Sequence, residues 1–362
     1  MIDCNPVEKD IKKLNWNIAT EIPAEGGQPK SIGYAGPVAG THNGVLFIGG
    51  GANFPDSMPW LGGAKKYHDE LWAYNPVKEN FKLFKLPYTL AYSANVSADK
   101  GVVSIGGENE SGIVSGVLMT QWNGREAVVT KLPSLPVAIT NAAATVIGTT
   151  LYVAGGETKD AASAKFFTLD MNDVADGWQE LKDLPQPTSH AVLLAVHNTK
   201  LYLVGGRKKT PSGISDLYAS LYEYDIATNM WSEKKSMPYA LCAGTGAVLK
   251  DDFIVMFGGD KGETFHKAET IIAQINNEKD TAVKSRLTGE KIKIQSTHPG
   301  FSKEVLWYDT KTDEWVIKGN IPFDVPATTT AVKMNGKVYI PSGEIKAGVR
   351  TAQILEGAEA HR

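Results

Sequence analysis

A glutamate and an arginine, Glu344 and Arg350, lie six residues apart in the stretch GEIKAGVRT. Residues 338–340 before them predict a strand, and Ser342-Gly343 interrupts it. The carboxylate would then stand at the end of one strand and the guanidinium at the start of the next. A guanidinium binds carboxylates in a fork geometry, and a neighbouring carboxylate can accept and return a proton. The spacing therefore predicts either an acid–base site or an internal salt bridge.

The element that ends before this pair, an apolar strand closed by small residues, recurs along the whole chain. The copies are VLFIGG (45–50), GVVSIGG (101–107), LYVAGG (151–156), LYLVGG (201–206), IVMFGG (254–259) and KVYIPSG (337–343). Strands with tyrosine or tryptophan follow, as in LYEYDIATNMW. An aliphatic-proline step precedes each copy, at Ile22-Pro23, Leu86-Pro87, Leu132-Pro133, Leu184-Pro185, Met237-Pro238 and Ile321-Pro322.

Six units of about four short strands, at roughly 50-residue spacing, are typical of a kelch-type β-propeller. After the sixth pair only one further strand fits, at 349–356, and the N-terminal LNWNIATEIP (14–23) would supply the missing outer strand. The sequence therefore predicts an all-β fold: a six-bladed propeller that forms a single domain over residues 1–362. Its last blade would be closed by the N-terminal strand.

Two inserts interrupt the repeats, at about 51–68 and 260–304. The segment KAETIIAQINNEKDTAVKSRL (267–287) combines helix formers with spaced aliphatic residues, which predicts one short helix. Inserts in repeat folds map to loops on one face, often the binding face.

The residues after the six pairs are mostly charged. Equivalent positions in a propeller encircle the axis, so we expect a funnel of polar groups with perturbed pKa values. The six residues are Gly51, Glu108, Glu157, Arg207, Asp260 and Glu344. The predicted substrate-binding residues are Arg207, Asn53, Asp260, Glu108 and Glu157, and Tyr67 could also line the funnel. His42 and His190 favour structural roles, since buried polar groups are normally paired.

Composition narrows the function classes. A net charge of −3 leaves no electrostatic footprint for nucleic acid, and no apolar stretch is long enough to span a membrane. Two cysteines, Cys4 and Cys242, provide neither a disulfide framework nor metal-ligand spacing, so we expect no metal and no cofactor. The polar N-terminus shows no signal peptide. Cys4 would be a lipid-anchor position only if a signal had been removed before it.

The stretch SGEIKAGVRT resembles the motif of the bacterial sialic acid mutarotases, or N-acetylneuraminate epimerases, which are six-bladed kelch propellers. GGGANF with YHDELWAYN, and the long insert after Gly258-Gly259, are similar to the same family. The blades occur in rotated order, which resembles a cyclically permuted branch. A closed ring tolerates such a permutation, because only the closing strand changes.

This resemblance implies an isomerase that interconverts the α and β anomers of N-acetylneuraminic acid. Glu344 would be the acid/base and Arg350 its catalytic partner, which would hold the sugar carboxylate. The implied partner is a small sugar acid, with no cofactor, and a homodimer is a further expectation. Relatives act in the periplasm, which implies that compartment, with the cytoplasm as the alternative because no signal peptide is visible.

Other functions of propellers remain open. The main alternative is a non-enzymatic kelch scaffold that binds a protein or a glycan, because a fold does not determine a function. Its binding would survive the loss of the Glu344 carboxylate. A sialidase would need repeated Ser-x-Asp-x-Gly-x-x-Trp boxes, and a kelch-type copper oxidase would need a Tyr–Cys pair with two histidine ligands; the sequence favours neither.

Overall fold

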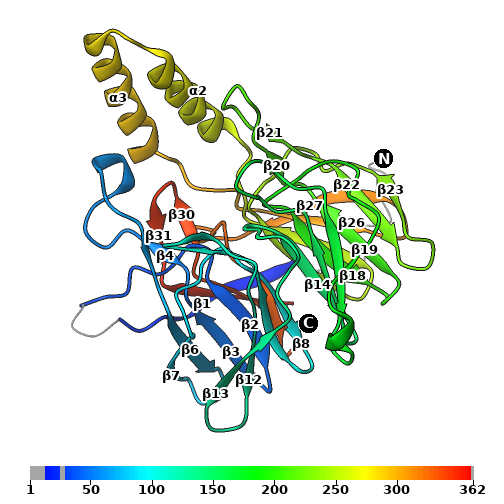
Figure 1. Cartoon of the computed structure of the whole chain (residues 1–362). Coiled ribbons are helices and arrows are strands. Elements are labelled where there is room, and N and C mark those ends of the chain that lie inside the picture. The colour runs from blue at the N-terminus through cyan, green and yellow to red at the C-terminus, as the bar shows by residue number, and fades with distance from the viewer. Residues whose placement is uncertain (1–12, 25–28, 360–362) are drawn as a thin grey trace, which may run out of the picture.

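Six four-stranded antiparallel sheets are arranged as blades around a central axis in the computed structural model, which describes residues 13–24 and 29–359 (Figure 1). The predicted all-β, six-bladed propeller is confirmed. Cys4, the predicted lipid-anchor position, lies outside the described residues. Within the described part of the chain, no helix has the length and apolar character needed to cross a membrane.

Each blade contains four strands in the order of the chain, from the axis outwards, except the last. Blade 1 consists of β2 (Val38–His42), β3 (Val45–Gly49), β6 (Glu70–Asn75) and β7 (Asn80–Lys85). Blade 2 consists of β8 (Ala94–Ala98), β9 (Gly101–Ile105), β12 (Val117–Trp122) and β13 (Ala127–Leu132). Blade 3 consists of β14 (Ala143–Ile147), β15 (Thr150–Ala154), β16 (Phe166–Asp170) and β17 (Gln179–Glu180). A 3-10 helix, η2 (Val174–Asp176), precedes β17.

Blades 4 to 6 follow the same plan. Blade 4 consists of β18 (Val192–Val196), β19 (Lys200–Val204), β22 (Leu221–Asp225) and β23 (Met230–Lys234). Blade 5 consists of β24 (Thr245–Leu249), β25 (Phe253–Phe257), β26 (Glu304–Asp309) and β27 (Glu314–Asn320). Blade 6 consists of β28 (Val332–Met334), β29 (Lys337–Pro341), β32 (Gln353–Glu359) and β1 (Leu14–Glu21).

The N-terminal strand closes the ring, as predicted. β1 is the outer strand of blade 6 and pairs antiparallel with β32, from Leu14 opposite Glu359 to Glu21 opposite Gln353. The first and last strands of the described chain therefore lie in one sheet, and β32 is paired on both of its edges, with β29 and with β1.

Neighbouring blades are held together by apolar faces and by tryptophans of the outer segments. Phe257, Trp307 and Ile340, from blades 5 and 6, are fully buried in one such contact. The indole N–H of each of three tryptophans also donates to a backbone carbonyl of the preceding blade. These bonds are Trp178 to Pro133 (2.8 Å), Trp231 to Lys182 (3.1 Å) and Trp315 to Lys235 (2.7 Å).

The aliphatic-proline step has one structural role in all six blades. The aliphatic residue is mostly buried, and its N–H donates to a carbonyl just before the third strand of the preceding repeat unit, as Leu86 donates to Asp69. In the segment LPSLP this bond belongs to Leu135, which donates to Ser115 (2.9 Å). The assignment to Leu132-Pro133 was therefore wrong by three residues, because two adjacent Leu-Pro steps look alike until the tertiary hydrogen bond is known.

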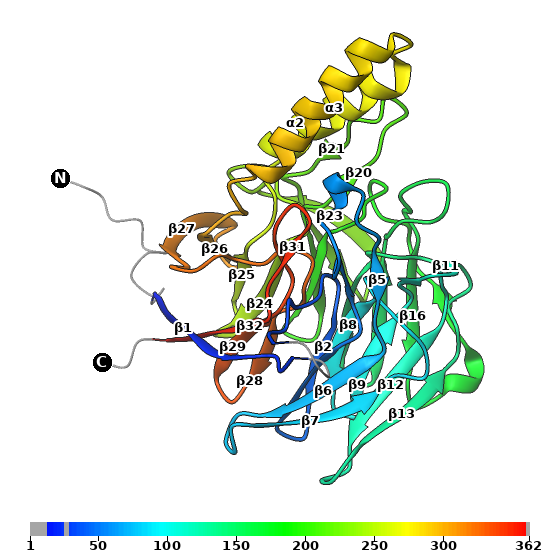
Figure 2. The ribbon, with the colours of Figure 1, turned by 90° about the vertical axis from the view of Figure 1, so that its left-hand side faces the viewer.

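Short hairpins extend beyond the glycine pairs on one face of the propeller. They are β4 (Ala52–Asn53) with β5 (Lys66–Tyr67), β10 (Glu108–Asn109) with β11 (Gly112–Ile113), β20 (Arg207–Lys208) with β21 (Asp216–Leu217), and β30 (Glu344–Lys346) with β31 (Val349–Arg350). Figure 2 shows β5, β11, β20 and β31 on the side of the ring from which the helices project.

The long insert contains two helices, α2 (Glu263–Asn277) and α3 (Thr281–Ser296), so the single helix predicted over 267–287 was wrong. The break falls at Asp280, whose carboxylate accepts from the N–H groups of Ala282 and Val283 and so caps α3. The pair stands on the hairpin face (Figures 1 and 2), where α3 contacts the 3-10 helix η1 (Pro59–Leu61) of the other insert.

Candidate active site

One residue in each blade, the first after the glycine pair, forms an isolated antiparallel bridge with the loop that leads into the inner strand. The bridges are Ala35–Ala52, Ala91–Glu108, Thr140–Glu157, Ser189–Arg207, Cys242–Asp260 and Ala327–Glu344. The pair itself has positive φ, for example 61° at Gly106 and 108° at Gly107, which glycine adopts at little cost. The six bridge residues therefore occupy equivalent positions around the axis, and we call them the bridge ring.

The bridge ring differs from the sequence prediction in blade 1. Of the three glycines at 49–51, Gly49 ends β3, while Gly50 (φ 56°) and Gly51 (φ 74°) form the pair. The N–H of Gly51 donates to Leu90, as that of Gly107 donates to Ile139. The expectation that Gly51 occupies the ring was therefore wrong, and Ala52 takes that place.

A second ring, closed by six hydrogen bonds, follows immediately after the bridge partners. The N–H of each member donates over 2.8–2.9 Å to the carbonyl of the member in the preceding blade, and the last bond joins blade 1 to blade 6. All six members have φ between 51° and 59°. They are Gly36, Tyr92, Asn141, His190, Ala243 and Thr328.

This closed ring separates the channel between the inner strands from the hairpin side of the propeller, where the bridge ring lies; we call that side the funnel. The left-handed conformation costs a non-glycine residue about 1–3 kcal/mol, and such strain often marks functional sites. Because the backbone groups of the ring satisfy one another, only its side chains remain available to a ligand. The channel behind the ring contains a cavity of about 420 Å³. Tyr92 and His190 border that cavity as members of the closed ring, whereas the bridge-ring residues Glu108, Glu157, Arg207, Asp260 and Glu344 do not line it.

Glu344 and Arg350 face each other across the β30–β31 hairpin and form an ion pair, with Arg350 Nη1 3.3 Å from Glu344 Oε1. Oε1 also accepts from the N–H of Gly348. Glu344 Oε2 has no hydrogen-bond partner among the described residues. The spacing predicted either an internal salt bridge or an acid–base site. The structure contains the salt bridge, and it leaves Oε2 of Glu344 available to a ligand.

The guanidinium of Arg350 is held on several sides. Its Nε donates to the carbonyl of Ala52 (3.3 Å), and its Cζ lies 4.7 Å from the centre of the Phe54 ring. The side chain is 5% exposed, against 20% for Glu344. A planar guanidinium buried among these partners has one orientation, and it fixes the carboxylate that it binds.

Tyr92, a member of the closed ring, reaches the same pair and was missed by the sequence reasoning. Its hydroxyl lies near the Arg350 guanidinium. Burial raises the pKa of Tyr92 to about 12, since the lowering effect of Arg350 is partly opposed by Glu344 and Glu108. The phenol therefore keeps its proton near neutral pH and is a hydrogen-bond donor at the funnel floor.

Comparison with known proteins adds a family to this geometry. Residues 132–361 match the family model described as N-acetylneuraminate epimerase. The chain belongs to the N-acetylneuraminate epimerase family. Its relatives include three proteins named N-acetylneuraminate epimerase. That of Haemophilus influenzae (strain PittEE) is 28% identical over 62% of this chain and 58% of its own length, and that of Brucella melitensis biotype 1 is 30% identical over 61% of this chain and 57% of its own length. That of Yersinia pestis (strain Pestoides F) is 28% identical over 62% of this chain and 57% of its own length.

The chain thus spans less than two thirds of the length of these epimerase relatives. The family match includes blades 3 to 6, apart from the outer strand β1 of blade 6, and therefore Glu157, Arg207, Asp260, Glu344 and Arg350. It leaves out blades 1 and 2, which contribute Tyr92 and Glu108. The cyclic permutation stays a prediction.

In the epimerase-family funnel, Glu108 connects blades 1 and 2. Its Oε1 accepts from the hydroxyl of Tyr67 (2.7 Å) and from Lys65 Nζ (3.0 Å). Burial, followed by the bond to Glu108, raises the pKa of Tyr67. Lys65 Nζ also lies 5.2 Å from the centre of the Tyr92 ring. These contacts place Glu108 and Tyr67 beside the Tyr92 end of the site.

Asn53, predicted to bind substrate, has a different place. It is 4% exposed, and its amide is used by the carbonyl of Gly33 (3.0 Å) and by His68 Nε2 (2.9 Å). These contacts join the first insert to the loop after β1. Asn53 therefore stabilises the wall of the funnel, and its side chain is not presented to a ligand.

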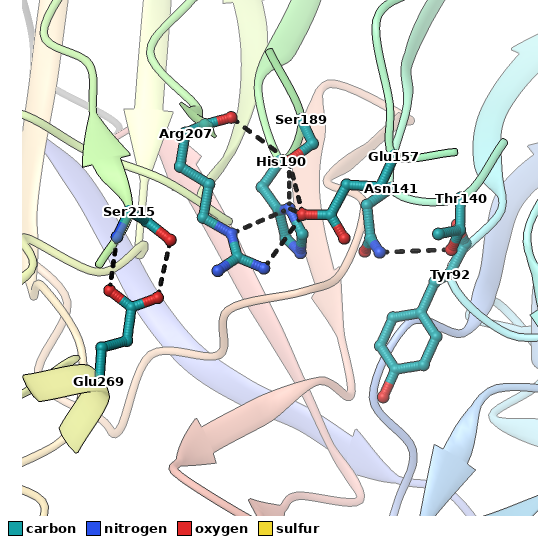
Figure 3. Close-up of polar contacts among 9 residues, drawn as sticks. All are labelled: Tyr92, Thr140, Asn141, Glu157, Ser189, His190, Arg207, Ser215 and Glu269. Carbon is teal, nitrogen blue, oxygen red and sulfur yellow. Dashed lines mark hydrogen bonds and ion pairs between the residues drawn. The ribbon is translucent and has the colours of Figure 1, made fainter. Parts of the chain in front are cut away.

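Glu157, His190 and Arg207 form a second polar cluster, between blades 3 and 4 (Figure 3). Arg207 Nη2 lies 3.3 Å from Glu157 Oε1, and Arg207 Nε donates to His190 Nδ1 (3.3 Å). Ser189 Oγ donates to the same Glu157 oxygen (3.0 Å). Burial lowers the pKa of His190 well below its ordinary value, and Arg207 lowers it further. The imidazole is therefore neutral.

Asp260, in the bridge ring of blade 5, serves the base of the helical insert. Its carboxylate accepts from the N–H of Gly262, immediately before α2. From α2, the buried Glu269 accepts from both the N–H (2.8 Å) and the Oγ (2.7 Å) of Ser215, next to β21 (Figure 3). The helix is thereby tied to the hairpin that carries Arg207, and Phe265 of α2 lies 5.1 Å from the Arg207 guanidinium.

The sequence contains a signal for the residues that were missed. Aligning the segments before the inner strands, LAYSA, ITNAA and TSHAV, places Tyr92, Asn141 and His190 in one column. That column is the closed ring. Glu269 has no comparable signal, because its partner Ser215 lies 54 residues away and a charged residue on a helix is normally solvated.

Proposed function

We propose that this protein is a mutarotase that interconverts the α and β anomers of N-acetylneuraminic acid. The observation that carries the proposal is the Glu344–Arg350 pair at the funnel, with one carboxylate oxygen left without a partner among the described residues. Membership of the N-acetylneuraminate epimerase family supports the substrate and the reaction class.

The proposed reaction opens and recloses the pyranose ring. Glu344 accepts the proton of the anomeric hydroxyl as the bond between C2 and the ring oxygen breaks, and it delivers that proton to the ring oxygen, directly or through water. The product is an open-chain ketone. Rotation about the C2–C3 bond presents its other face, and the reverse proton movements close the opposite anomer. General acid–base catalysis of this kind contributes about 10²- to 10⁴-fold.

Two neighbours have supporting roles in this scheme. Arg350 orients the Glu344 carboxylate. A guanidinium has five N–H donors, more than Glu344 and Ala52 require, so it can also bind the sugar carboxylate. Tyr92, protonated near neutral pH, would donate a hydrogen bond to the ring oxygen as negative charge develops there.

The test is proton NMR of the sugar anomers. A sialidase releases the α anomer, and its conversion to the β anomer is followed with wild-type protein, with Glu344→Gln and with Glu233→Gln, an exposed control on the outer strand β23. We expect wild type and the control to accelerate the exchange equally and Glu344→Gln to lose the acceleration by at least about 100-fold.

An unchanged exchange rate with folded wild-type protein would overturn the proposal. If the protein then bound the sugar, and Glu344→Gln bound it equally well, the binding scaffold would be the better description. Activity that survived in Glu344→Gln would remove Glu344 from the mechanism.

A further inference from the structure

The cluster of Glu157, His190 and Arg207 lies across the axis from the Glu344–Arg350 pair. The closed ring of hydrogen bonds orders the blades from 1 to 6, so blade 3, which carries Glu157, is opposite blade 6, which carries Glu344. Both carboxylates occupy the bridge ring. A ligand with its reacting carbon at Glu344 would therefore extend towards Glu157 and Arg207.

Each side chain of this cluster keeps one polar position unused within the described structure. The contacts of Glu157 engage Oε1, which leaves Oε2 as an acceptor. Those of Arg207 engage Nε and Nη2, which leaves donors on Nη1. A guanidinium can only donate, so His190 Nδ1 is the unprotonated nitrogen and Nε2 carries the proton. The cluster thus offers two donors and one acceptor from partly exposed side chains.

The charge of the cluster decides what kind of group it suits. The guanidinium and the carboxylate neutralise each other and the imidazole is uncharged, so the cluster is neutral overall. A ligand carboxylate would meet repulsion from Glu157 along with attraction from Arg207. Neighbouring hydroxyl groups both donate and accept, and they match an adjacent carboxylate, guanidinium and imidazole N–H without bringing charge.

We propose that Glu157, His190 and Arg207 form a subsite for a vicinal polyol, namely the three-carbon hydroxylated side chain (C7–C9) of the sialic acid. This inference rests on the proposed function and specifies which part of the substrate is read. Phe265 of α2, packed over the guanidinium, holds Arg207 in the orientation that presents its remaining N–H groups. The enzyme would thereby select nine-carbon sugar acids over shorter ones.

The test compares two substrates and two variants. We would measure kcat and KM for anomer exchange with N-acetylneuraminic acid and with its seven-carbon analogue, which lacks C8 and C9. For wild type, we expect kcat/KM to be about 10- to 100-fold lower on the analogue than on the full substrate, mainly because KM rises. Losing hydrogen bonds to charged groups typically has an effect of this size. Glu157→Gln should lose a similar factor on the full substrate and little more on the analogue.

Controls separate the subsite from the chemistry and from folding. Glu233→Gln should behave as wild type on both substrates. Arg207→Lys keeps the charge, loses the fork geometry and should resemble Glu157→Gln. A third substrate, with a hydroxyl in place of the C5 acetamide and an intact side chain, should lose the same factor in kcat/KM on Glu157→Gln as N-acetylneuraminic acid does.

The outcomes distinguish the two proposals. Equal kcat/KM of wild type on the nine- and seven-carbon sugars, with exchange still accelerated, would overturn the subsite and leave the mutarotase standing. The subsite would also be overturned if the effect of Glu157→Gln on kcat/KM disappeared on the substrate that lacks the C5 acetamide and persisted in full on the seven-carbon analogue. Absence of any acceleration by wild type would refute the proposed function itself.

Discussion

Two arginine–carboxylate pairs lie in the same funnel, yet the fold builds them differently. Arg350 and Glu344 are partners across a single hairpin, six residues apart, whereas Arg207 and Glu157 come from neighbouring blades, 50 residues apart. In both pairs the Arg–Glu distance is 3.3 Å, and in both an aromatic ring covers the guanidinium, Phe54 in one and Phe265 in the other.

The two pairs differ in what else touches the carboxylate. Beside Glu344 stands a tyrosine hydroxyl that retains its proton, which suits proton transfer. Beside Glu157 stand a serine hydroxyl and a neutral imidazole, which suit the binding of uncharged hydroxyl groups. Equivalent ring positions therefore carry different polar neighbours in the two blades, and our two proposals, chemistry at Glu344 and recognition at Glu157, rest on that difference.

Arg350→Lys tests the catalytic pair and should have the largest effect. Lysine keeps the charge and loses the bond from Nε to Ala52 and the planar contact with Phe54, so Glu344 is no longer fixed. We expect exchange to slow by about 100-fold, in the range of a lost acid–base contribution. The equivalent Arg207→Lys should act mainly on KM, and equal kcat losses in both variants would abolish the distinction between the pairs.

Tyr92→Phe sharpens the contrast between the two neighbourhoods. It removes the hydroxyl and keeps the ring, so we expect kcat to fall by about 10- to 100-fold with KM nearly unchanged, as for a donor that acts on developing charge. Initial rates of anomer exchange, followed by NMR at several substrate concentrations, give both parameters. A rise in KM alone would mean that Tyr92 binds the substrate and has no part in the chemical step.

The same variant has a signature in alkaline stability. The pKa of Tyr92 is raised from 10 to about 12, so the folded protein holds a proton that the unfolded chain releases above pH 10, and stability falls as pH rises from 10 to 12. Tyr92→Phe should show a shallower loss of unfolding free energy over that window than wild type.

Glu269→Gln tests the support of the recognition pair. The amide can accept only one of the two bonds from Ser215, which should reduce the unfolding free energy by about 1–2 kcal/mol and loosen α2. Because Phe265 of α2 covers Arg207 but does not reach Arg350, KM for the nine-carbon sugar should rise several-fold with kcat retained. Denaturant unfolding and NMR exchange provide the two readouts. A fall in kcat without a change in KM would contradict the separation of the two pairs.

His190→Gln should have the smallest effect, confined to acid. The folded pKa of His190 is well below 6.5, so below that pH the unfolded chain binds a proton that the folded protein refuses, and stability falls as pH decreases. The variant should lose part of this acid sensitivity between pH 6.5 and 5. An unchanged slope of unfolding free energy with pH would show that the pKa of His190 is not lowered in the folded cluster beside Arg207, Lys209 and Glu157.

The repeats were visible in the sequence because each blade forms from local strands. Period, glycine pairs and the tryptophan strands predicted six blades and the closure by residues 14–23, which the pairing of β1 with β32 confirms. Where two local signals lie next to each other, the pattern misplaces the element: at Gly49–Gly51 and at LPSLP, only hydrogen bonds to another segment identify the equivalent residue.

The same division holds for the funnel. The pairing of Glu344 with Arg350 follows from the residues alone, because a hairpin of six-residue separation places its ends opposite each other. The cluster of Glu157, His190 and Arg207, the reach of Tyr92 to Arg350 and the burial of Asn53 depend on how neighbouring blades are rotated around the axis. Blade rotation is set by packing between sheets and by the closed ring of backbone hydrogen bonds, and neither is encoded within any one repeat.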